Sequence, residues 1–464
     1  MENTYYDAIV IGAGQAGVPL AKKLAKAGKK TALIEKRYIG GTCVNDGCTP
    51  TKAMIASARL AYLAGREDDM GVHIDGFKID LPAIIKRKDG IVKNARDGSL
   101  QVLESTKGLD VLFGEASFIS EKTLSVILNN GGTAEISAGW IFIDTGTVAL
   151  IPEIDGLEDI EYLTNTSILE LTEIPEHLLI IGGNYIGLEF GQMFKRFGSK
   201  VTILEKSERL LKKEDKDISE CLTNILTEEK ITIHNSAHVQ KFKKNADGKI
   251  VAAIRMEDGK DHQLTCSHVL VAAGRVPQTK ALNLHNAGVE LDDKGFIKVD
   301  GYLETNVKGI YALGDVKGGP QFTHIAYNDY TIVYRNLIEG TNYNTADRPV
   351  PYCMFTDPQL GRVGITEQEA KNQKLNYKIA TLSMERVARA AEVSETRGMM
   401  KAVVDADSKQ ILGAAIIGEQ GGEIMSVLQM AMEGGITYDR IRYCVFAHPT
   451  YSESLNNLFM SIED

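Results

Sequence analysis

The chain has 464 residues, of which 44% are hydrophobic and 25% are charged, and this length corresponds to about three globular domains. Its formal net charge of −10 argues against general binding to nucleic acids or anionic membranes, because both require a basic surface. The chain starts without a basic segment and apolar core, and it contains no run of about 18 apolar residues. We therefore expect a cytoplasmic protein with no membrane span.

The first predicted element is an apolar strand, residues 8–11, that leads directly into a glycine-rich run. Gly12 allows a tight turn, Gly14 allows a pyrophosphate to approach the backbone, and Gly17 allows a helix to pack closely on the strand. That helix would present its partly positive N-terminus to a phosphate. The next strand ends in Glu35, where a carboxylate can bind an adenosine ribose. The order predicts a dinucleotide site, with a glycine-rich turn that binds nothing as the alternative.

Two of the six cysteines lie close together just after this unit. Cys43 and Cys48 have four residues between them and precede a helix-like stretch over residues 53–64. A helix N-terminus lowers the pKa of a thiol, and two thiols this close can form a reversible disulfide. A structural disulfide is disfavoured in the cytoplasm, and a zinc site would need a second pair of ligands at a suitable spacing. The spacing therefore predicts a redox-active cysteine pair.

A second nucleotide-binding pattern follows an apolar strand at residues 178–181. Its glycines are Gly182, Gly183 and Gly187, and its second strand ends in Glu205. Asn184 takes the place of the middle glycine. Asparagine tolerates a positive φ better than other non-glycine residues, but its side chain restricts the approach of a pyrophosphate. The pattern predicts a second dinucleotide site with one departure.

Glu205 bears on the choice of nucleotide. A carboxylate at this place binds the ribose 2′-hydroxyl of NADH and repels the 2′-phosphate of NADPH. Lys206 and Arg209 follow closely and would soften this preference, unless they are ordinary solvated cations of a surface turn. We expect NADH, with NADPH as the alternative.

The rest of the chain adds polar residues at the ends of predicted strands. Residues 114–143 show the pattern of short alternating strands, and they end just before Gly146. Gly274 closes the second nucleotide-binding unit, and a later strand delivers Asp315, whose carboxylate could bind a ribitol chain. A proline-containing stretch at residues 347–351 indicates a domain boundary. The tail beyond it has no nucleotide fingerprint and predicts a separate α+β domain.

Together with His448 and Glu453, these motifs resemble those of the pyridine nucleotide–disulfide oxidoreductases, the family of dihydrolipoamide dehydrogenase, glutathione reductase and mercuric reductase. The resemblance covers almost the whole chain. It implies an α/β fold of two Rossmann-like domains, which bind FAD and NAD(P), and a C-terminal α+β dimerisation domain. The implied order is an FAD-binding domain (1–150), an NAD(P)-binding domain (151–273), a return to the FAD-binding domain (274–346) and the dimerisation domain (347–464).

The resemblance also assigns the cofactor-binding residues. Those implied for FAD are Gly12, Gly14, Gly17, Glu35, Thr42, Lys52, Gly146 and Asp315. Those implied for NAD(P) are Gly182, Gly183, Tyr185, Gly187, Glu205 and Gly274. The ring of Tyr185 would cover the nicotinamide pocket, with simple packing in the turn as the alternative.

The implied electron path runs through the cysteine pair. Cys48 would take electrons from the flavin, and Cys43 would exchange them with the substrate. Lys52 and Glu189 would form an ion pair beside the flavin, where a cation stabilises negative charge on the ring. The alternative for these two residues is that they are surface charges of helices.

His448 and Glu453 match the acid–base pair of the family. In this pair the carboxylate orients the imidazole, which takes a proton from one thiol and returns it to another. A structural histidine is the alternative. In the family the pair reaches into the site of the other subunit, so we expect a homodimer.

Several positions bear on the electron acceptor. Glu205 stands where glutathione reductases carry a basic cluster, and the C-terminus lacks the cysteine pair that delivers the metal in mercuric reductases. Thr49, Thr51 and Phe446 depart from the usual pattern of dihydrolipoamide dehydrogenases. The stretches that resemble a mercuric-reductase-like subgroup, which includes a copper(II) reductase, are residues 319–326, 355–358, 384–390 and 452–459.

We therefore expect an FAD-dependent NAD(P)H oxidoreductase that reduces a disulfide, a thiol-reactive electrophile or a metal ion, with no resident metal. Dihydrolipoamide dehydrogenase is the alternative within the family, and a flavin-loaded redox sensor or scaffold with little turnover is the alternative outside enzymology. The other four cysteines are Cys221, Cys266, Cys353 and Cys444. We expect them to pack as small hydrophobic side chains, although Cys444, near His448, is also a candidate auxiliary thiol.

Overall fold

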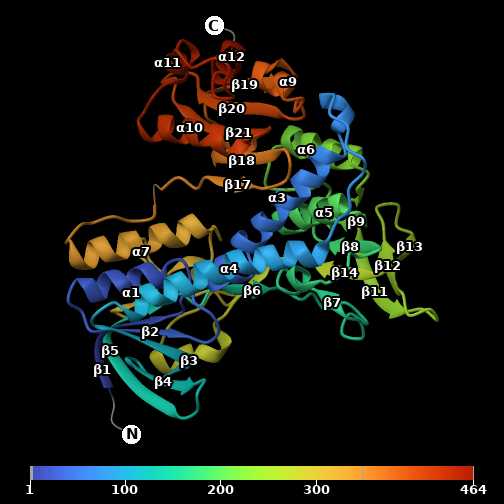
Figure 1. Cartoon of the computed structure of the whole chain (residues 1–464). Coiled ribbons are helices and arrows are strands. Elements are labelled where there is room, and N and C mark those ends of the chain that lie inside the picture. Colours follow the sequence, from blue (N-terminus) through green and yellow to red (C-terminus); the bar gives the residue numbers. More distant parts are fainter. Residues whose placement is uncertain (1–3, 347, 463–464) are drawn as a thin grey trace. The chain divides into compact units, whose positions relative to one another are not determined.

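The computed structural model describes residues 4–346 and 348–462, and it contains two compact units that are interleaved in the sequence (Figure 1). Unit 1 consists of Met1–Ala53, Ile85–Leu150 and Gly274–Arg348, and unit 2 consists of Met54–Ile84, Ile151–Ala273 and Pro349–Asp464. Residue 347, at which we placed a domain boundary, lies outside the described residues. The four-part domain division stays a prediction.

The centre of unit 1 is a parallel sheet built around β1. This strand pairs in parallel with β2 and β5, and the parallel order continues from β2 to β3 and from β5 to β16. Ile9 and Val10 of β1 are fully buried, because a central strand of such a sheet is covered on both faces. The strands are β1 (Thr4–Ile11), β2 (Thr31–Glu35), β3 (Leu109–Ser120), β4 (Thr123–Leu128), β5 (Thr133–Ile143) and β16 (Ile310–Ala312).

Residues 114–143 form longer strands than the sequence pattern predicted. β3 has 12 residues and β5 has 11. Each of these strands pairs twice, because one part joins the parallel sheet and another part pairs antiparallel with β4. The prediction of short strands is confirmed for β4, which has 6 residues, and was wrong for β3 and β5, because the pattern cannot show that one strand serves both pairings.

Helices α1 and α7 lie side by side in unit 1 (Figure 1). Leu20 and Leu24 of α1 are buried in one apolar cluster with Ile332 and Val333 of α7 and with Phe142 of the sheet. Leu20 and Leu24 are four residues apart, so they lie on one face of α1. The helices are α1 (Gly17–Lys26), α2 (Gly41–Asn45), α3 (Cys48–Ala64), α4 (Leu81–Glu104) and α7 (Thr323–Ile338), of which α3 and α4 pass from one unit into the other.

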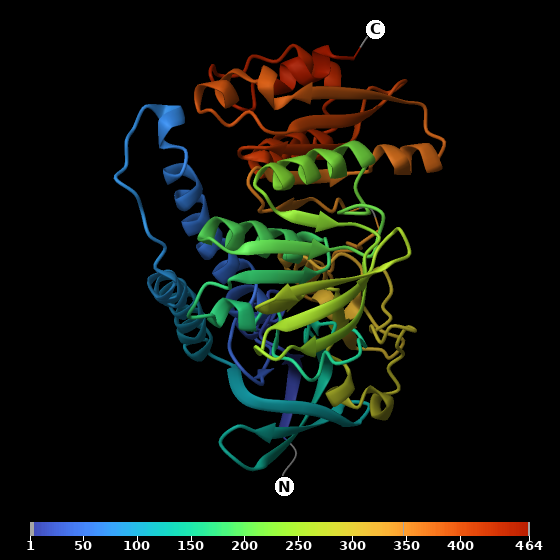
Figure 2. The ribbon, with the colours of Figure 1, turned by 90° about the vertical axis from the view of Figure 1, so that its right-hand side faces the viewer.

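Unit 2 contains a second parallel sheet, with the strand order β10-β9-β8-β14-β7. Strand β8, helix α5 and strand β9 repeat the order of β1, α1 and β2, and an antiparallel sheet of β11, β12 and β13 follows in the chain (Figure 2). The elements are β7 (Tyr162–Leu163), β8 (His177–Ile181), α5 (Tyr185–Phe197), β9 (Lys200–Leu204), α6 (Lys216–Glu228), β10 (Thr232–His234), β11 (His238–Lys244), β12 (Ile250–Arg255), β13 (Asp261–Cys266) and β14 (His268–Val271).

The tail of the chain, also in unit 2, forms an antiparallel sheet with helices. The strand order is β17-β18-β21-β20-β19, and α10 packs on β18 and β21. Ile424 and Leu428 of α10 share an apolar cluster with Met400 and Ile416 of the sheet, which gives the tail its α+β character. The elements are β17 (Tyr352–Met354), β18 (Gln359–Gly364), α8 (Glu367–Asn372), β19 (Tyr377–Ser383), α9 (Ala388–Glu392), β20 (Met399–Asp405), β21 (Ile411–Gly418), α10 (Gly421–Glu433), α11 (Tyr438–Arg442) and α12 (Ser454–Met460).

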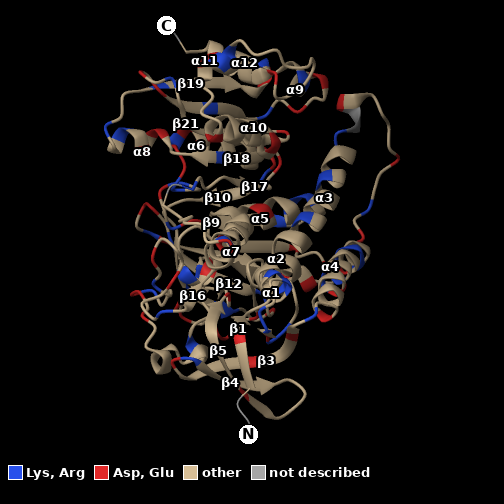
Figure 3. Ribbon diagram, turned by 90° about the vertical axis from the view of Figure 1, so that its left-hand side faces the viewer, with Lys and Arg blue, Asp and Glu red and all other residues tan. Residues whose placement is uncertain are grey.

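Charged residues of both signs are interspersed along the ribbon, for example on α4 (Figure 3). Within the described part of the chain, no helix is both long enough and apolar enough to cross a membrane.

Candidate active site

The turn between β1 and α1 has no room for side chains at its first and third glycines. Gly12 has a φ of +103°, and a Cβ there would lie 2.2 Å from the carbonyl oxygen of Asp144. A Cβ on Gly17 would lie 2.0 Å from the carbonyl oxygen of Gly12. The loop is therefore a cradle lined by backbone at a helix N-terminus, which fits the diphosphate of FAD.

A buried carboxyl group lies against this loop, and the sequence analysis assigned it no role. Oδ2 of Asp144 accepts a 2.7 Å hydrogen bond from the backbone N–H of Gly17. A Cβ on Gly14 would lie 2.7 Å from the same oxygen, so the middle glycine is needed here for space. Burial raises the pKa of Asp144 well above the ordinary range, and the charges of Asp315 and Asp329 add to this shift.

Glu35, at the end of β2, is held by two backbone N–H groups. Oε2 accepts a 2.9 Å hydrogen bond from Ala13, and Oε1 accepts a 2.7 Å hydrogen bond from Arg37. These contacts fix the carboxylate beside the glycine loop, where an adenosine ribose would bind.

Asp315 meets a two-stranded antiparallel pair made of β6 (Thr147–Ala149) and β15 (Arg275–Pro277). Oδ2 of Asp315 accepts a 3.0 Å hydrogen bond from the hydroxyl of Thr147, and Nε of Arg275 donates to that hydroxyl at 2.7 Å. Burial raises the pKa of Asp315, and the charge of Arg275 opposes the shift. Arg275 was not predicted, because its contact with Thr147 joins residues that are distant in the chain.

Two predicted glycines flank these strands. Gly146 precedes β6 with a φ of +67°, and Gly274 precedes β15 with a φ of +137°. Gly274 lies in unit 1, whereas the other residues predicted to bind NAD(P) lie in unit 2. Its role in nucleotide binding stays a prediction.

Cys43 and Cys48 lie at the junction of two helices. Cys43, preceded by the half-buried Thr42, belongs to α2, and Cys48 is the first residue of α3. The prediction that the helix starts at residue 53 was wrong, because Pro50 falls in the first turn, where its missing N–H would have no partner. Sγ of the exposed Cys48 lies 3.4 Å from the hydroxyl oxygen of Thr323, the first residue of α7.

The two thiols interact with each other. The pKa of Cys43 is raised, mainly by its hydrogen bond with Cys48 and then by burial, while the hydroxyl of Thr323 and the charge of Lys52 act in the opposite direction. Interacting groups of this kind lose their protons in two separate steps, so deprotonation of the pair passes through a state with one thiolate and one thiol. A dithiol centre needs this state, because only the thiolate is nucleophilic. Thr323 was not predicted, since it lies in a distant part of the chain.

The second glycine loop repeats the geometry of the first. Gly182 has a φ of +116°, and a Cβ there would lie 2.4 Å from the carbonyl oxygen of Ala272. A Cβ on Gly187 would lie 2.1 Å from the carbonyl oxygen of Gly182. The N–H of Gly183 donates a 2.7 Å hydrogen bond to Oε2 of Glu205. The loop is again a backbone cradle at the N-terminus of a helix, α5.

Asn184 does not adopt the positive φ that we considered for it. Its φ of −115° and ψ of −178° are extended, so tolerance of a positive φ has no role at this position. Its Oδ1 accepts a 3.0 Å hydrogen bond from the N–H of Tyr185 and caps α5. The expected effect of its side chain on pyrophosphate binding stays a prediction.

The ring of Tyr185 rests against Tyr352, a residue that the sequence analysis did not assign. The ring centroids are 6.0 Å apart and the planes are tilted by 53°. The hydroxyl of Tyr352 donates a hydrogen bond to Glu214, whose Oε2 lies 3.0 Å from Nη2 of Arg362. Burial raises the pKa of Glu214, and the charge of Arg362 opposes this shift. A buried ion pair therefore holds the partner of Tyr185 in place.

Glu189 is buried in α5, about one helical turn from the start of the helix. Its Oε1 accepts a 2.8 Å hydrogen bond from the backbone N–H of Phe355. Lys52 lies in unit 1 and Glu189 in unit 2, and their ion pair stays a prediction.

His448 and Glu453 are brought together. Nδ1 of the imidazole lies 2.9 Å from Oε2 and 3.2 Å from Oε1 of Glu453, and the His448 side chain is 67% exposed. Because an ionised carboxylate can only accept, Nδ1 carries the proton and Nε2 is left to take one. The geometry suits proton transfer from a thiol.

The remaining cysteines do not form one class. Burial raises the pKa of Cys266 to about 12 and that of Cys221 to about 11, as for thiols that pack in a core. Cys353 is half-buried. Cys444 is exposed, so the expectation that it packs as a hydrophobic side chain was wrong. Its backbone carbonyl is held by the amide of Asn456, and this leaves the side chain outside the core.

Comparison with known proteins assigns the chain to a family. Residues 6–329 match the family described as pyridine nucleotide-disulphide oxidoreductase, and residues 350–459 match the dimerisation domain of that family. The chain is 37% identical to the probable pyridine nucleotide-disulfide oxidoreductase RclA of Escherichia coli over 99% of both proteins. It is 36% identical to a mercuric reductase of Bacillus cereus over 98% of this chain and 71% of that protein.

A solved structure gives the same result. The Cu(II) complex of the HOCl-induced flavoprotein disulfide reductase RclA from Escherichia coli superposes with a TM-score of 0.91 at 36% identity and covers 100% of both chains. These comparisons confirm the predicted fold class and the use of FAD and a pyridine nucleotide. The chain is therefore a member of the pyridine nucleotide-disulphide oxidoreductase family.

Proposed function

We propose that this protein oxidises NADH and passes the electrons through Cys43 and Cys48 to an acceptor that reacts with thiolates. The observation that carries the proposal is the dithiol itself, in which two hydrogen-bonded sulfurs meet the hydroxyl of Thr323. FAD, when bound, supplies the ring that accepts hydride from the nicotinamide and passes an electron pair to sulfur. The loop at Gly12, together with Glu35 and Asp315, would hold it.

The geometry at Glu205 supports NADH rather than NADPH. Oε2 and Oε1 of this carboxylate accept 2.7 Å hydrogen bonds from the N–H groups of Gly183 and Ser207, which fix it at the end of β9. Nη1 of Arg209 lies 2.7 Å from Oε1 of Glu208, so this guanidinium is already paired. A fixed carboxylate favours a ribose hydroxyl and disfavours a 2′-phosphate.

The acceptor follows from the chemistry of thiolates. With a disulfide acceptor, the Cys43 thiolate would attack one sulfur and release the other as a thiol after protonation. Cys48 would then displace the second thiol and close the Cys43–Cys48 disulfide, which two electrons from NADH reopen. With a soft or borderline metal ion, the two thiolates would bind the ion, and the two electrons from one NADH would reduce one mercury(II) to mercury(0) or two copper(II) to copper(I). The relatives named for mercury and solved with Cu(II) support the metal ion or another electrophile as the acceptor.

In this scheme, His448 acts on the other subunit of a homodimer. The match of residues 350–459 to a dimerisation domain and the exposure of the imidazole both support a site shared between two copies. Nε2 of His448 would take the proton of a thiol of the other subunit, while Glu453 holds Nδ1.

Steady-state NADH oxidation with copper(II), mercuric ion and lipoamide tests the acceptor. We expect Cys43→Ser to abolish metal reduction and His448→Ala to leave most of it. Fast lipoamide turnover that falls about 100- to 10,000-fold in His448→Ala, without thiolate-dependent metal reduction, would make dihydrolipoamide dehydrogenase the better assignment. Turnover below about 0.1 per second with every acceptor, against a usual range of roughly 1–1,000 per second, would favour a redox sensor.

A further inference from the structure

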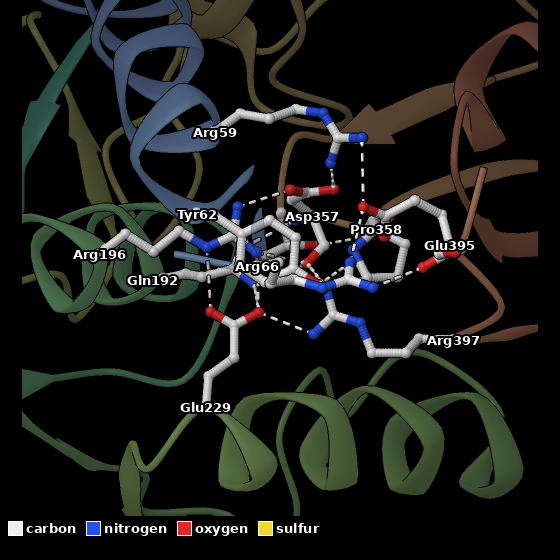
Figure 4. A network of polar contacts seen from close by, with 12 residues as sticks. Arg59, Tyr62, Arg66, Gln192, Arg196, Glu229, Asp357, Pro358, Glu395 and Arg397 are labelled. Carbon is white, nitrogen blue, oxygen red and sulfur yellow. Dashed lines mark hydrogen bonds and ion pairs between the residues drawn. The ribbon is translucent and has the colours of Figure 1, made fainter. Parts of the chain in front are cut away.

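Asp357 is the centre of a buried ionic network within unit 2 (Figure 4). Its side chain is 8% exposed, Oδ1 accepts a 2.5 Å hydrogen bond from Arg59, and Oδ2 accepts a 2.5 Å hydrogen bond from Arg196. The backbone N–H and carbonyl of Asp357 make two more hydrogen bonds, of 2.8 and 2.7 Å, with the amide of Gln192. Because Arg59 lies in α3 and the other two residues lie in α5, this one residue joins two helices.

The network around Asp357 contains as many cations as anions. Glu229 lies 2.8 Å from both Arg196 and Arg397, and these contacts extend the network beyond α5. Burial opposes ionisation of Asp357, yet the charges of Arg196 and Arg59 hold its pKa below the ordinary value. The network consists of the cations Arg59, Arg66, Arg196 and Arg397 and the anions Glu229, Asp357, Glu395 and Glu419.

The ring of Tyr62 fixes the rotation of α3 in this network. The guanidinium carbons of Arg196, Arg397 and Arg66 lie 4.0, 5.0 and 5.1 Å from its centroid, and Arg66 also donates a 2.8 Å hydrogen bond to its hydroxyl. Arg59 and Tyr62 are three residues apart and lie on one face of α3, and Arg66 lies two residues beyond the end of this helix. Charge-assisted guanidinium bonds are directional, so the contacts of Arg59 with Asp357 and of Tyr62 with Arg196 favour one orientation of α3 relative to α5.

The same two helices carry the predicted redox groups near their other ends. Helix α3 begins at Cys48, and Arg59 follows it 11 residues later, which is about 16 Å along the helix axis. Helix α5 begins at Tyr185 and contains Glu189. The N–H of Phe355, two residues before Asp357, is the donor to Glu189. One loop thus contacts the anchored end of α3, the anchored end of α5 and Glu189.

We propose that Asp357 is a positioning residue for the redox reaction, which sets the orientation of α3, and with it Cys48, and of α5, and with it Glu189 and Tyr185. The inference rests on the proposed function. A purely structural role is the competing explanation, because breaking any buried ion pair destabilises a fold. The two explanations predict different results when the contact of Asp357 with either α3 or α5 is removed.

Three variants of the FAD-loaded protein remove the contact of Asp357 with α3, the contact with α5, or both. Arg59→Gln releases α3, Arg196→Gln releases α5, and Asp357→Asn releases both. The control is Lys401→Gln, because the Lys401 side chain is 4% exposed and lies 2.7 Å from Asp217 and 2.6 Å from Glu367, with no contact to α3 or α5 among the described ion pairs. The measurements are the thermal midpoint, the thiolate-to-flavin absorbance after reduction, the rate of alkylation of Cys43 and Cys48 by iodoacetamide, and the rate of flavin reduction by NADH.

We expect Arg59→Gln to change the absorbance and the alkylation rate by roughly 3- to 30-fold, the range typical of coupling through a network, and to spare flavin reduction. Arg196→Gln should slow flavin reduction by a similar factor and spare the thiol signals, and Asp357→Asn should change both. Lys401→Gln should lower the thermal midpoint and change neither.

Equal losses of stability in all four variants, with thiol signals and flavin reduction unchanged, would overturn the inference and leave Asp357 a structural residue. If Asp357→Asn does not fold, the two arginine variants decide, because Arg59 is partly exposed, at 27%. The inference would also be overturned if Arg59→Gln and Arg196→Gln changed the same measurements. A wild-type protein that shows neither the absorbance nor reactive thiols would instead refute the proposed function.

Discussion

The two glycine loops of this protein share their backbone geometry and differ at the middle position. Gly12 and Gly182 both have positive φ, and a Cβ on either would lie 2.2 or 2.4 Å from a carbonyl oxygen of a neighbouring strand end. In both loops a backbone N–H donates to the glutamate that ends the next strand. The middle residue is glycine at position 14 and asparagine at position 184.

The neighbouring strand explains the difference. Asp144 follows β5, and its carboxyl leaves no space for a side chain on Gly14. Ala272 follows β14 at the corresponding place and carries no carboxyl, while Asn184 is exposed and caps α5. The first glycine is therefore required by the backbone, and the middle one by a residue far away in the sequence. A missing middle glycine does not count against a nucleotide loop.

The largest effects on cofactor binding and flavin reduction should come from Gly12 and Gly182, the first glycines of the two loops. We expect Gly12→Ala to yield protein without bound FAD, because the left-handed backbone costs a side chain about 1–2 kcal/mol and the Cβ also clashes. Gly182→Ala should keep FAD but slow its reduction by NADH more than about 100-fold, since small misplacements cost that much. Flavin absorbance per chain after desalting and anaerobic mixing with NADH check both. A Gly12→Ala protein with full FAD content would contradict the geometry.

Substitution of the glutamate beside each loop should affect a different ligand, FAD for Glu35 and NADH for Glu205. A hydrogen bond to a charged group is worth about 1.5–3 kcal/mol, so Glu205→Ala should weaken NADH binding roughly 10- to 150-fold. Binding of NADPH should improve, because the repulsion of its 2′-phosphate is removed. Glu35→Ala should lower FAD affinity and spare NADH. The dependence of flavin reduction on the concentration of each nucleotide measures this, and equal weakening of NADH and NADPH would refute the assignment of Glu205.

Asp144 should make the first glycine loop sensitive to pH in a way that the second loop, with Ala272 at the corresponding place, is not. Its folded-state pKa is raised above the unfolded value of about 3.9, so its contribution to stability is complete below that value and is lost as the pH rises toward the folded pKa. Asp144→Asn keeps an acceptor for Gly17 and removes the charge. It should be more stable than the wild type at pH 8, and this advantage should shrink toward pH 4. Urea unfolding at both pH values provides the comparison, and an advantage that grows as the pH falls would contradict the sign.

The smallest effects should come from the position that differs. Asn184→Ala removes the cap of α5 and should cost about 0.5–2 kcal/mol, whereas Asn184→Gly should cost only a few tenths. If the side chain restricts the pyrophosphate, Asn184→Gly should bind NADH slightly more tightly than the wild type. Thermal unfolding and NADH titration report the two effects. A tenfold loss of NADH affinity in Asn184→Gly would mean that this side chain binds the nucleotide.

The parts that sequence reasoning predicted are those whose constraints are local. The loop at Gly12 and the carboxylate of Glu35 belong to one stretch of strand, helix and strand, so the spacing of the residues determines their geometry. The proximity of His448 and Glu453 is equally local, because one turn of chain joins them. The start of α3 was misplaced only because Pro50 was not considered as a first-turn residue.

The parts that sequence reasoning missed depend on contacts between distant segments. Asp144 reaches the first loop through the pairing of β5 with β1. Thr323 reaches Cys48 across 275 residues, and Asp357 reaches Arg196 across 161. Thr323 and Asp357 lie in stretches that resemble the mercuric-reductase-like subgroup, but this resemblance assigns them no role, since each acts through neighbours that only the folded chain supplies.

The central claim is that the Cys43–Cys48 pair takes electrons from NADH through FAD. Anaerobic titration of the FAD-loaded protein with NADH tests it most directly. We predict a two-electron-reduced form with long-wavelength thiolate-to-flavin absorbance, which is lost in Cys48→Ser and kept in the control Cys221→Ser. Absorbance and acceptor reduction that are unchanged in Cys48→Ser would contradict the account.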